Sequence, residues 1–239
     1  MGFFRQLISV LRINYDEFFY SGSPLYFFHH IPKSGGTSVR NALSNWFNII
    51  PDYRPSVEET PETLKYLNNR LKLDKYNSKH CIFGHFELPG NYLHERYPEV
   101  FDDPDKYKIF TIFRDPLDLA ISLYYFQIKT NIKNRGESLE EFLKRINNYT
   151  ARRLPCDMNN FKHILQRYFY IGINEHMQES LDKLARILKK PKIKIPNLNR
   201  TQKDQQVLNI SPDTIRIFRQ NNVVDYHIYE FALKKFKEL

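Results

Sequence analysis

The sequence predicts an α/β fold with a central parallel sheet that is covered by helices on both faces. Short apolar runs, rich in aromatic and β-branched residues, have the length and composition of buried strands. They lie at residues 25–31, 81–86, 108–113 and 168–173. Helix-compatible segments separate them, and strands that alternate with helices form parallel sheets. At 239 residues the chain is long enough for one core. We therefore expect a single domain over residues 1–239, with residues 1–24 as a helical lead-in.

The intervening segments carry helix signals. Residues 36–48 read as the first core helix. Thr60-Pro61 and Asp115-Pro116 each combine a capping side chain with a proline that suits the first turn. They predict helices over 61–73 and from 116 to about 128. The remaining expectations are one short helix in the loop 87–107, mostly helical structure in 131–166, a helix near 177–188, a loop over 191–210 and a helical C-terminal region.

Composition narrows the class of partner. Lys and Arg number 36 against 27 Asp and Glu, a formal charge of +9, which favours an anionic ligand. No apolar run is long enough to span a membrane, although residues 1–24 leave a weak surface association open. Two cysteines are too few for a disulfide framework and favour a reduced, intracellular chain.

The first predicted strand leads into the sequence His-Ile-Pro-Lys-Ser-Gly-Gly-Thr-Ser, at residues 30–38. Paired glycines allow a sharp turn and a close approach of the backbone to a ligand. The amides of such a loop and of the following helix start favour an anion. The side chains add a mobile charge and three hydroxyl donors. A phosphate-type cradle is therefore expected at Lys33, Ser34, Gly35, Gly36, Thr37 and Ser38.

The loop differs from a Walker A motif, in which the lysine follows the last glycine. It resembles the 5′-phosphosulfate loop of sulfotransferases that use 3′-phosphoadenosine 5′-phosphosulfate (PAPS). Within that superfamily it is most similar to the carbohydrate branch, which is heparan sulfate 2-O-sulfotransferase-like. The resemblance implies a P-loop-like three-layer sandwich. It also implies PAPS as co-substrate and adenosine 3′,5′-bisphosphate (PAP) as product, with Lys33 acting on the leaving oxygen.

A second motif is Arg-Asp-Pro at residues 114–116, followed by Ser122. Arginine can bind a phosphate in a planar, bidentate manner and serine can add a lateral hydrogen bond. Arg114 follows a predicted strand and Ser122 lies about two turns into the next helix. The pair resembles the 3′-phosphate site of the same superfamily. An ordinary ATP enzyme does not need such a site, because ATP has no 3′-phosphate.

A third element is Gly84-His85, which ends the second predicted strand. A histidine can accept a proton from an alcohol near neutral pH. The element resembles the Gly-His of the heparan-type branch and implies that His85 is the catalytic base. His29, His30 and His80 are alternatives as the active histidine, with His30 expected to orient the loop. Glu87 is an alternative base or a partner of His85.

The C-terminal third carries weaker resemblances. Residues 172–175 look like the strand and acid that follow the second ligand site. Residues 197–201 look like a late loop near the nucleotide, which implies that Arg200 and Thr201 contact the cofactor. Asp225 and Tyr229 resemble positions of a closing helix and are expected to be structural.

Together these motifs predict transfer of a sulfuryl group from PAPS to a hydroxyl acceptor, either a glycan or a small molecule. No metal is expected, because the acidic cluster at 102–105 reads as a capped or solvated turn. Nucleic acid is not expected as a partner. A P-loop-like phosphotransferase or kinase and a non-catalytic polyanion-binding module remain alternatives. Sulfotransferases of this superfamily that modify glycans in animal cells usually carry a membrane anchor. Because no apolar run here is long enough for one, we expect a bacterial or otherwise cytoplasmic enzyme. The oligomeric state stays open.

Overall fold

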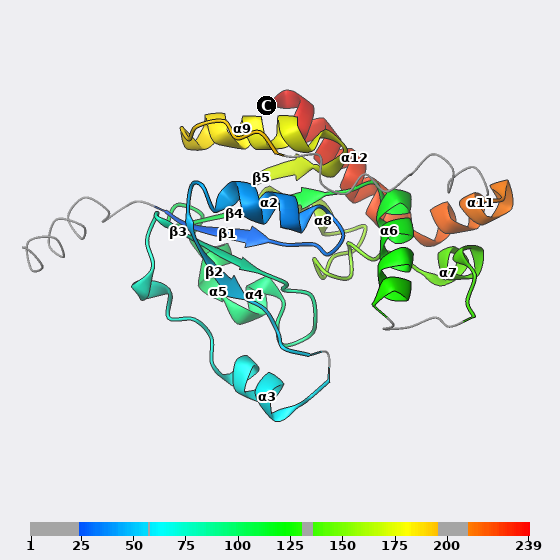
Figure 1. The fold of residues 1–239 in the computed structure, drawn as a ribbon, viewed down its shortest axis with the longest axis horizontal. Helices are drawn as coiled ribbons and strands as arrows, with labels where there is room; N and C mark the ends of the chain where they lie inside the picture. The colour runs from blue at the N-terminus through cyan, green and yellow to red at the C-terminus, as the bar shows by residue number, and fades with distance from the viewer. Residues whose placement is uncertain (1–23, 57, 131–135, 196–209) are drawn as a thin grey trace, which may run out of the picture.

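The computed structural model describes residues 24–56, 58–130, 136–195 and 210–239. These residues contain a five-stranded sheet with the order β2-β3-β1-β4-β5 (Figure 1). Every neighbouring pair of strands is parallel. The strands are β1 (Leu25–His29), β2 (Asn48–Asp52), β3 (His80–Gly84), β4 (Tyr107–Phe113) and β5 (Tyr168–Ile173). The predicted α/β class with a parallel sheet is thereby confirmed.

Helices connect the strands and cover the sheet. They are α2 (Gly36–Leu43), α3 (Pro61–Asn68), α4 (Leu93–Arg96), α5 (Pro98–Asp102), α6 (Pro116–Lys129), α7 (Leu139–Arg145), α8 (Phe161–Gln166), α9 (Met177–Leu188), α11 (Pro212–Asn221) and α12 (Val223–Glu238). Two short 3₁₀ turns, η1 (Leu73–Lys75) and η2 (Asn174–His176), complete the described elements. Figure 1 shows α3 as an excursion that projects away from the sheet.

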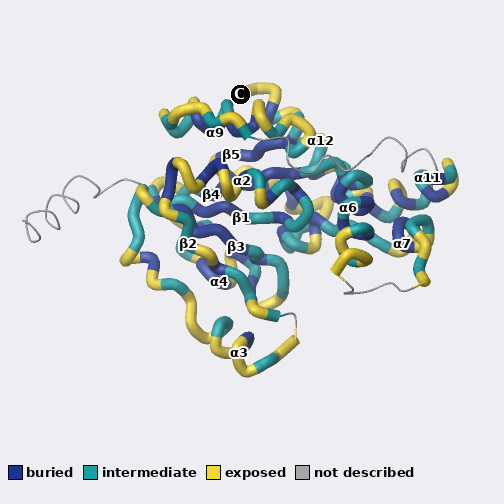
Figure 2. The backbone as a smooth tube through the Cα atoms, viewed as in Figure 1, coloured by how far each residue is buried: buried dark blue, intermediate teal, exposed yellow. Residues whose placement is uncertain are grey.

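Successive side chains of a strand point to opposite faces of the sheet. Helices cover both faces, so both sets of side chains are buried. Phe28 of β1 lies in one core with Val39 of α2 and Leu184 of α9. Phe27, its neighbour, lies in the other core with Tyr97 and Ile228, from the side of α4, α5 and α12. The tube of Figure 2 is correspondingly dark blue along most of β1, β3, β4 and β5. This arrangement confirms the predicted three-layer sandwich.

A third apolar cluster joins α6, α7 and α11. Helix α6 begins directly after β4, so this cluster lies toward the carboxyl ends of the strands, as Figure 1 shows. The helix start is as predicted: the Asp115 side chain accepts hydrogen bonds from the amides of Leu117 and Asp118, and Pro116 occupies the first turn. Strand β4 thus delivers Arg114 to the sheet edge immediately before a firmly capped helix.

Several boundaries differ from the prediction. The helix predicted over 36–48 ends at Leu43, and the chain then enters a strand that was not predicted, β2. Strand β2 is short, contains Pro51 and lies at the sheet edge, where proline is tolerated because one side of the strand is unpaired. The helix predicted over 61–73 ends at Asn68, and residues 87–107 contain two short helices.

The largest error concerns residues 131–166, which were predicted to be mostly helical. Within the described part, helices α7 and α8 are separated by turns over residues 146–160. This segment is held by the C-terminal helix: the Asp225 carboxylate accepts the amides of Thr150, at 2.9 Å, and Ala151, at 2.8 Å. Asp225 lies 75 residues from Thr150, so local helical propensity could not predict this contact or the turns that it stabilises.

Other expectations lie outside the described residues. These are the lead-in up to residue 23 and the late loop with Arg200 and Thr201. The one-domain expectation for residues 1–239 stays a prediction. Both cysteines carry free thiols. None of the helices in the described ranges is both long enough and apolar enough to cross a membrane.

Candidate active site

The predicted functional residues meet at the carboxyl edge of the sheet. Strands β3, β1 and β4 are neighbours, and they are followed by His85, by the 30–38 loop and by Arg114. After β1 the chain forms β2 and β3 on one side of that strand, and it then forms β4 and β5 on the other side. Such a reversal opens a ligand crevice in parallel sheets. The convergence expected from the sequence is confirmed by two contacts, His85–His30 and Arg114–Lys33.

The 30–38 loop requires its two glycines. Gly35 caps α2 with a φ of 78°, in the left-handed region that favours glycine. A Cβ on Gly35 would overlap the side chain of Asn174, and a Cβ on Gly36 would overlap the His30 ring. The ring of His30 therefore packs against the start of α2, which is the loop-orienting position expected for it. Lys33 also has a positive φ, 68°, so the loop holds local strain.

Arg114 and Lys33 place two cations beside the loop. The Arg114 Nη1 donates to the Lys33 carbonyl at 2.9 Å, and the Lys33 Nζ lies 4.1 Å from the centre of the Phe126 ring. Burial lowers the pKa of Lys33, and the charges of Arg114 and Lys129 lower it further. A desolvated group of like charges attracts an anion.

Two buried polar atoms at this place have no hydrogen-bond partner among the described residues: the Ser34 Oγ and the Arg114 Nε. Buried donors in proteins are nearly always satisfied. Both atoms belong to residues that were predicted to bind an anionic cofactor. The donor set therefore fits a phosphate or sulfate group.

The other predicted binding residues lie on the two helices that flank the loop. Thr37 is exposed and Ser38 is half-buried in the first turn of α2, and Ser122 is half-buried on α6. Glu175 fastens the start of α6, because its carboxylate accepts the Asp115 amide at 3.2 Å and the Tyr229 hydroxyl at 2.9 Å. The structural contact expected of Tyr229 is thus present.

His85 is held on several sides. Its Nε2 lies 2.7 Å from the Nδ1 of His30, and its backbone carbonyl accepts the Asn91 amide at 3.0 Å. The Tyr53 ring stands edge-on, with its centre 4.8 Å from that of the imidazole. Burial lowers the pKa of His85, while the carboxylate of Glu87 acts in the opposite direction. A neutral imidazole near pH 7 is the form that accepts a proton.

The competing histidines separate clearly. The ring of His29 is buried and its Nδ1 is 2.7 Å from the Tyr168 hydroxyl. His80 begins β3, at the opposite end of that strand from His85, and its Nδ1 contacts Asn77. Burial and the neighbouring His85 lower the pKa of His30 to about 3, so His30 remains neutral. Of these histidines, His85 directly follows β3 at the edge of the sheet where the 30–38 loop and Arg114 lie.

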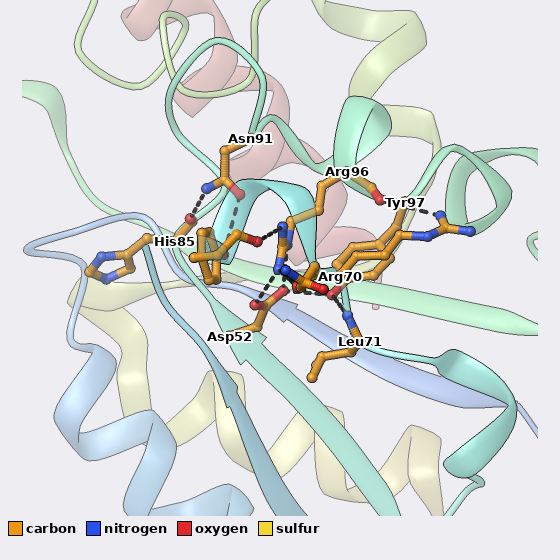
Figure 3. A network of polar contacts seen from close by, with 9 residues as sticks. Asp52, Arg70, Leu71, His85, Asn91, Arg96 and Tyr97 are labelled. Atoms are coloured by element: carbon orange, nitrogen blue, oxygen red, sulfur yellow. Dashed lines mark hydrogen bonds and ion pairs between the residues drawn. The ribbon is translucent and has the colours of Figure 1, made fainter. Parts of the chain in front are cut away.

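A buried network beside His85 was not predicted (Figure 3). Arg96 binds both carboxylate oxygens of Asp52, at 2.9 and 3.0 Å, and Tyr97 donates its hydroxyl to the same carboxylate at 2.7 Å. Arg96 also lies over the Tyr66 ring, whose hydroxyl donates to Asn91. The network thus reaches the carbonyl of His85 through Asn91. No sequence signal marked it, because its members are spread over three separate segments.

A second unpredicted contact joins Arg153, from the 146–160 segment, to Glu87. Glu87 in turn faces His85, with 3.8 Å between its Oε1 and the Nδ1. The described residues contain no group of three or more His, Cys, Asp or Glu side chains that could hold a metal ion. The site thus combines the cations of Lys33 and Arg114 with a histidine that contacts the 30–38 loop through His30.

The fold is similar to that of a solved sulfotransferase structure. The crystal structure of mouse sulfotransferase SULT7A1 complexed with PAP is similar with a TM-score of 0.51 and 14% identity, over 87% of this chain and 89% of the mouse chain. The chain has the fold of that sulfotransferase. Because the identity is low, the likeness is one of fold alone. No protein-family model and no curated protein matches the sequence.

Two further solved structures show weaker similarity. A sulfotransferase from Alicyclobacillus acidocaldarius has a TM-score of 0.45 and 14% identity, over 82% of this chain and 94% of that one. Retinol dehydratase, crystallised with androsterone and PAP, has a TM-score of 0.40 and 16% identity, over 71% of this chain and 60% of that one. Both scores are too low to inform the architecture.

Proposed function

We propose that this protein is a sulfotransferase that moves a sulfuryl group from PAPS to an acceptor hydroxyl. The observation that carries the proposal is the meeting of the lysine loop, Arg114 and His85 at one sheet edge, with Arg114 hydrogen-bonded to the loop backbone. This arrangement offers two anion-binding groups and a base within one site. The fold shared with a PAP-bound sulfotransferase supports the assignment.

The donor nucleotide is anionic at both ends, and the chain supplies a group for each. The loop residues Lys33 to Ser38 would hold the 5′ end. Arg114 and Ser122 would hold the 3′-phosphate, which distinguishes PAPS from ATP. The Ser34 Oγ and the Arg114 Nε, which have no hydrogen-bond partner within the described ranges, are donors of the kind that such groups require. Arg200 and Thr201 are proposed as further contacts by resemblance of the sequence 197–201 alone.

In the proposed reaction PAPS supplies the sulfuryl group when bound. His85 takes the proton of the acceptor hydroxyl, which raises the nucleophilicity of that oxygen. Lys33 neutralises the charge that develops on the leaving oxygen. The amides and hydroxyls of the 35–38 segment stabilise the group in transfer, because fixed donors act strongly where water is excluded. Transfer of this kind needs in-line geometry, as phosphoryl transfer does.

We propose a carbohydrate as the acceptor. The +9 formal charge suits an acidic glycan, and the loop and the Gly-His element are most similar to the heparan-type branch. A small alcohol is the alternative class of acceptor. A screen of sugars, sterols and simple alcohols with sulfur-35-labelled PAPS would distinguish these acceptors.

Thermal-shift titration tests the donor assignment. A ligand present at 100 times its Kd stabilises a fold by about 2.7 kcal/mol. For a chain of this size that is a rise in Tm of roughly 5–11 °C. We expect this rise with PAP and a much smaller one with ATP-Mg. A larger shift with ATP-Mg would favour a phosphotransferase, and no shift with either would favour a polyanion-binding module.

The Arg114→Ala variant locates the 3′-phosphate site in the same assay. It should lose most of the stabilisation by PAP and little of that by adenosine 5′-phosphosulfate, which has no 3′-phosphate. Equal losses with the two nucleotides would contradict the proposed role of Arg114.

A further inference from the structure

The contacts of His85 continue beyond its immediate neighbours to a carboxylate and a guanidinium. The Oε1 of Glu87 lies 3.8 Å from the Nδ1 of His85. The other carboxylate oxygen, Oε2, is bound by the Nε of Arg153. Glu87 and Arg153 are about one-fifth exposed. The ion pair is therefore partly shielded from solvent and is stronger than one on an open surface.

Arg153 is itself fixed in place. Its guanidinium carbon lies 3.3 Å from the centre of the Tyr149 ring, and its Nη1 donates to the Tyr149 carbonyl at 3.0 Å. The turn that carries both residues is bound to the buried carboxylate of Asp225 through the amides of Thr150 and Ala151. The C-terminal helix thus determines where Arg153 lies, and Arg153 determines where Glu87 lies.

The second nitrogen of His85 shows which tautomer this arrangement favours. A carboxylate beside the Nδ1 favours a proton on that atom, because the N–H dipole then points toward negative charge. The Nε2 is left with its lone pair, and it accepts a hydrogen bond from the Nδ1 of the neutral His30, 2.7 Å away. The basic nitrogen of His85 is therefore Nε2, on the side of the anion-binding loop.

We propose that Glu87 and Arg153 are a positioning pair for His85, in which Glu87 orients the imidazole with its proton on Nδ1 and its lone pair on Nε2, and Arg153 holds Glu87 in reach. The proposal rests on the proposed function, in which His85 is the base. The acceptor hydroxyl takes the place of His30 as the hydrogen-bond donor to Nε2. Its proton then moves to Nε2, and the proton on Nδ1 stays where it is. Glu87 then faces the imidazolium and stabilises it, without becoming protonated.

The electrostatics of the pair act in opposite directions. Glu87 raises the pKa of His85 and Arg153 lowers it, against a larger lowering by burial. The other titratable groups near His85 are the rings of His30 and His29, both of which burial keeps neutral, and the phenol of Tyr53. Arg153 thus limits the effect of Glu87, so that His85 stays neutral and able to accept a proton near pH 7.

Nitrogen-15 NMR of histidine-labelled protein tests the pair directly, because it reports the pKa and the tautomer of His85 without turnover. We expect Glu87→Gln to lower the pKa of His85 and to reduce the share of the Nδ1–H tautomer. Arg153→Met should raise the pKa, since Glu87 then acts without its counter-charge. In activity assays Glu87→Gln should lower kcat by roughly tenfold or more, a part of the ~10²–10⁴-fold that a general base supplies, with little change in KM.

The matched control is Glu137→Gln, which breaks an ion pair of similar kind with Arg145 in an exposed part of the same region. It should change neither the pKa nor the tautomer of His85. If Glu87→Gln leaves both at their wild-type values, the positioning pair is refuted. Glutamine has nearly the same shape as glutamate, so Glu87→Gln is expected to fold. It therefore tests the pair by itself if Arg153→Met does not fold. The proposed function is tested separately, by PAP binding and transfer in the wild-type protein.

Discussion

Two residues at the site divide the proposed chemistry between them. Within the described residues, His85 contacts the 30–38 loop through His30, whereas Arg114 is hydrogen-bonded to the backbone of that loop at Lys33. Proton acceptance and nucleotide binding should therefore be separable by mutation. This separation distinguishes a sulfotransferase from a protein that only binds anions.

Replacement of His85 by alanine should lower kcat by about 10²–10⁴-fold, the usual share of general base catalysis. Affinity for PAP should stay within about twofold of the wild type, because the nucleotide is held by the loop and by Arg114. Single-turnover assays and calorimetric titration with PAP measure the two effects. The control is His80→Ala, at the far end of β3, which should retain activity. Wild-type turnover of His85→Ala would remove the histidine from this role.

The ion pair of Asp52 and Arg96 predicts an effect on stability at the same scale. Both side chains are 3% exposed, so Arg96→Met leaves a buried carboxylate without its charge partner. We expect a loss of about 3–5 kcal/mol in the free energy of unfolding, measured by urea denaturation. Glu99→Gln, which breaks the exposed pair with Arg70, should cost about 0–1 kcal/mol. Similar costs for the two variants would contradict the structural importance of the buried pair.

At the scale of elements, local sequence patterns predicted those segments that are fixed by local chemistry. The strands around residues 25–31, 108–113 and 168–173 were predictable from runs of apolar and β-branched residues, and α6 from its Asp115 cap. Strand β2 was not predictable, since it contains Pro51 and is stabilised by pairing with β3 alone. The turns of the 146–160 segment were missed for a related reason: their anchor, Asp225, lies on α12.

That anchor predicts a pH-dependent stability. Burial raises the pKa of Asp225 to about 6, against 3.8 for a free carboxyl. A carboxyl with a raised pKa binds its proton more tightly in the folded chain, so it favours folding below pH 4 and this contribution is lost as the pH rises to about 6. The difference corresponds to about 3 kcal/mol.

We therefore expect Asp225→Asn to be more stable relative to the wild type at pH 7 than at pH 4.5, by about 2 kcal/mol, since at pH 4.5 the unfolded carboxyl is already mostly ionised. Urea unfolding at the two pH values measures it. Asn cannot accept both amides as a carboxylate does, so a constant loss at each pH is expected as well. A difference that does not change with pH would show that the pKa of Asp225 is not raised.

At the scale of the whole molecule, the net charge predicts how acceptor use depends on salt. A chain with a formal charge of +9 attracts an acidic glycan over a distance comparable to the Debye length, which shrinks from about 10 Å at 0.1 M salt to about 3 Å at 1 M. With PAPS saturating, kcat/KM for an acidic oligosaccharide should fall by about tenfold or more between 0.05 and 0.5 M salt. The value for a neutral sugar should change little. Equal salt dependence for the two acceptors would count against an acidic glycan.

By itself the sequence determined the fold class, the glycine loop over residues 30–38 and the three positions that end neighbouring strands. These features depend on residues that are adjacent in the chain: apolar runs, paired glycines, and a capped proline after Arg114. The resemblance of Gly84-His85 singled out one histidine, but only the tertiary structure shows what surrounds it and where His29, His30 and His80 lie. The contacts of His85 with His30, and of Glu87 with Arg153, join residues 55 and 66 positions apart. Such contacts arise from the packing of whole elements, and packing leaves no periodic or local signal in the sequence.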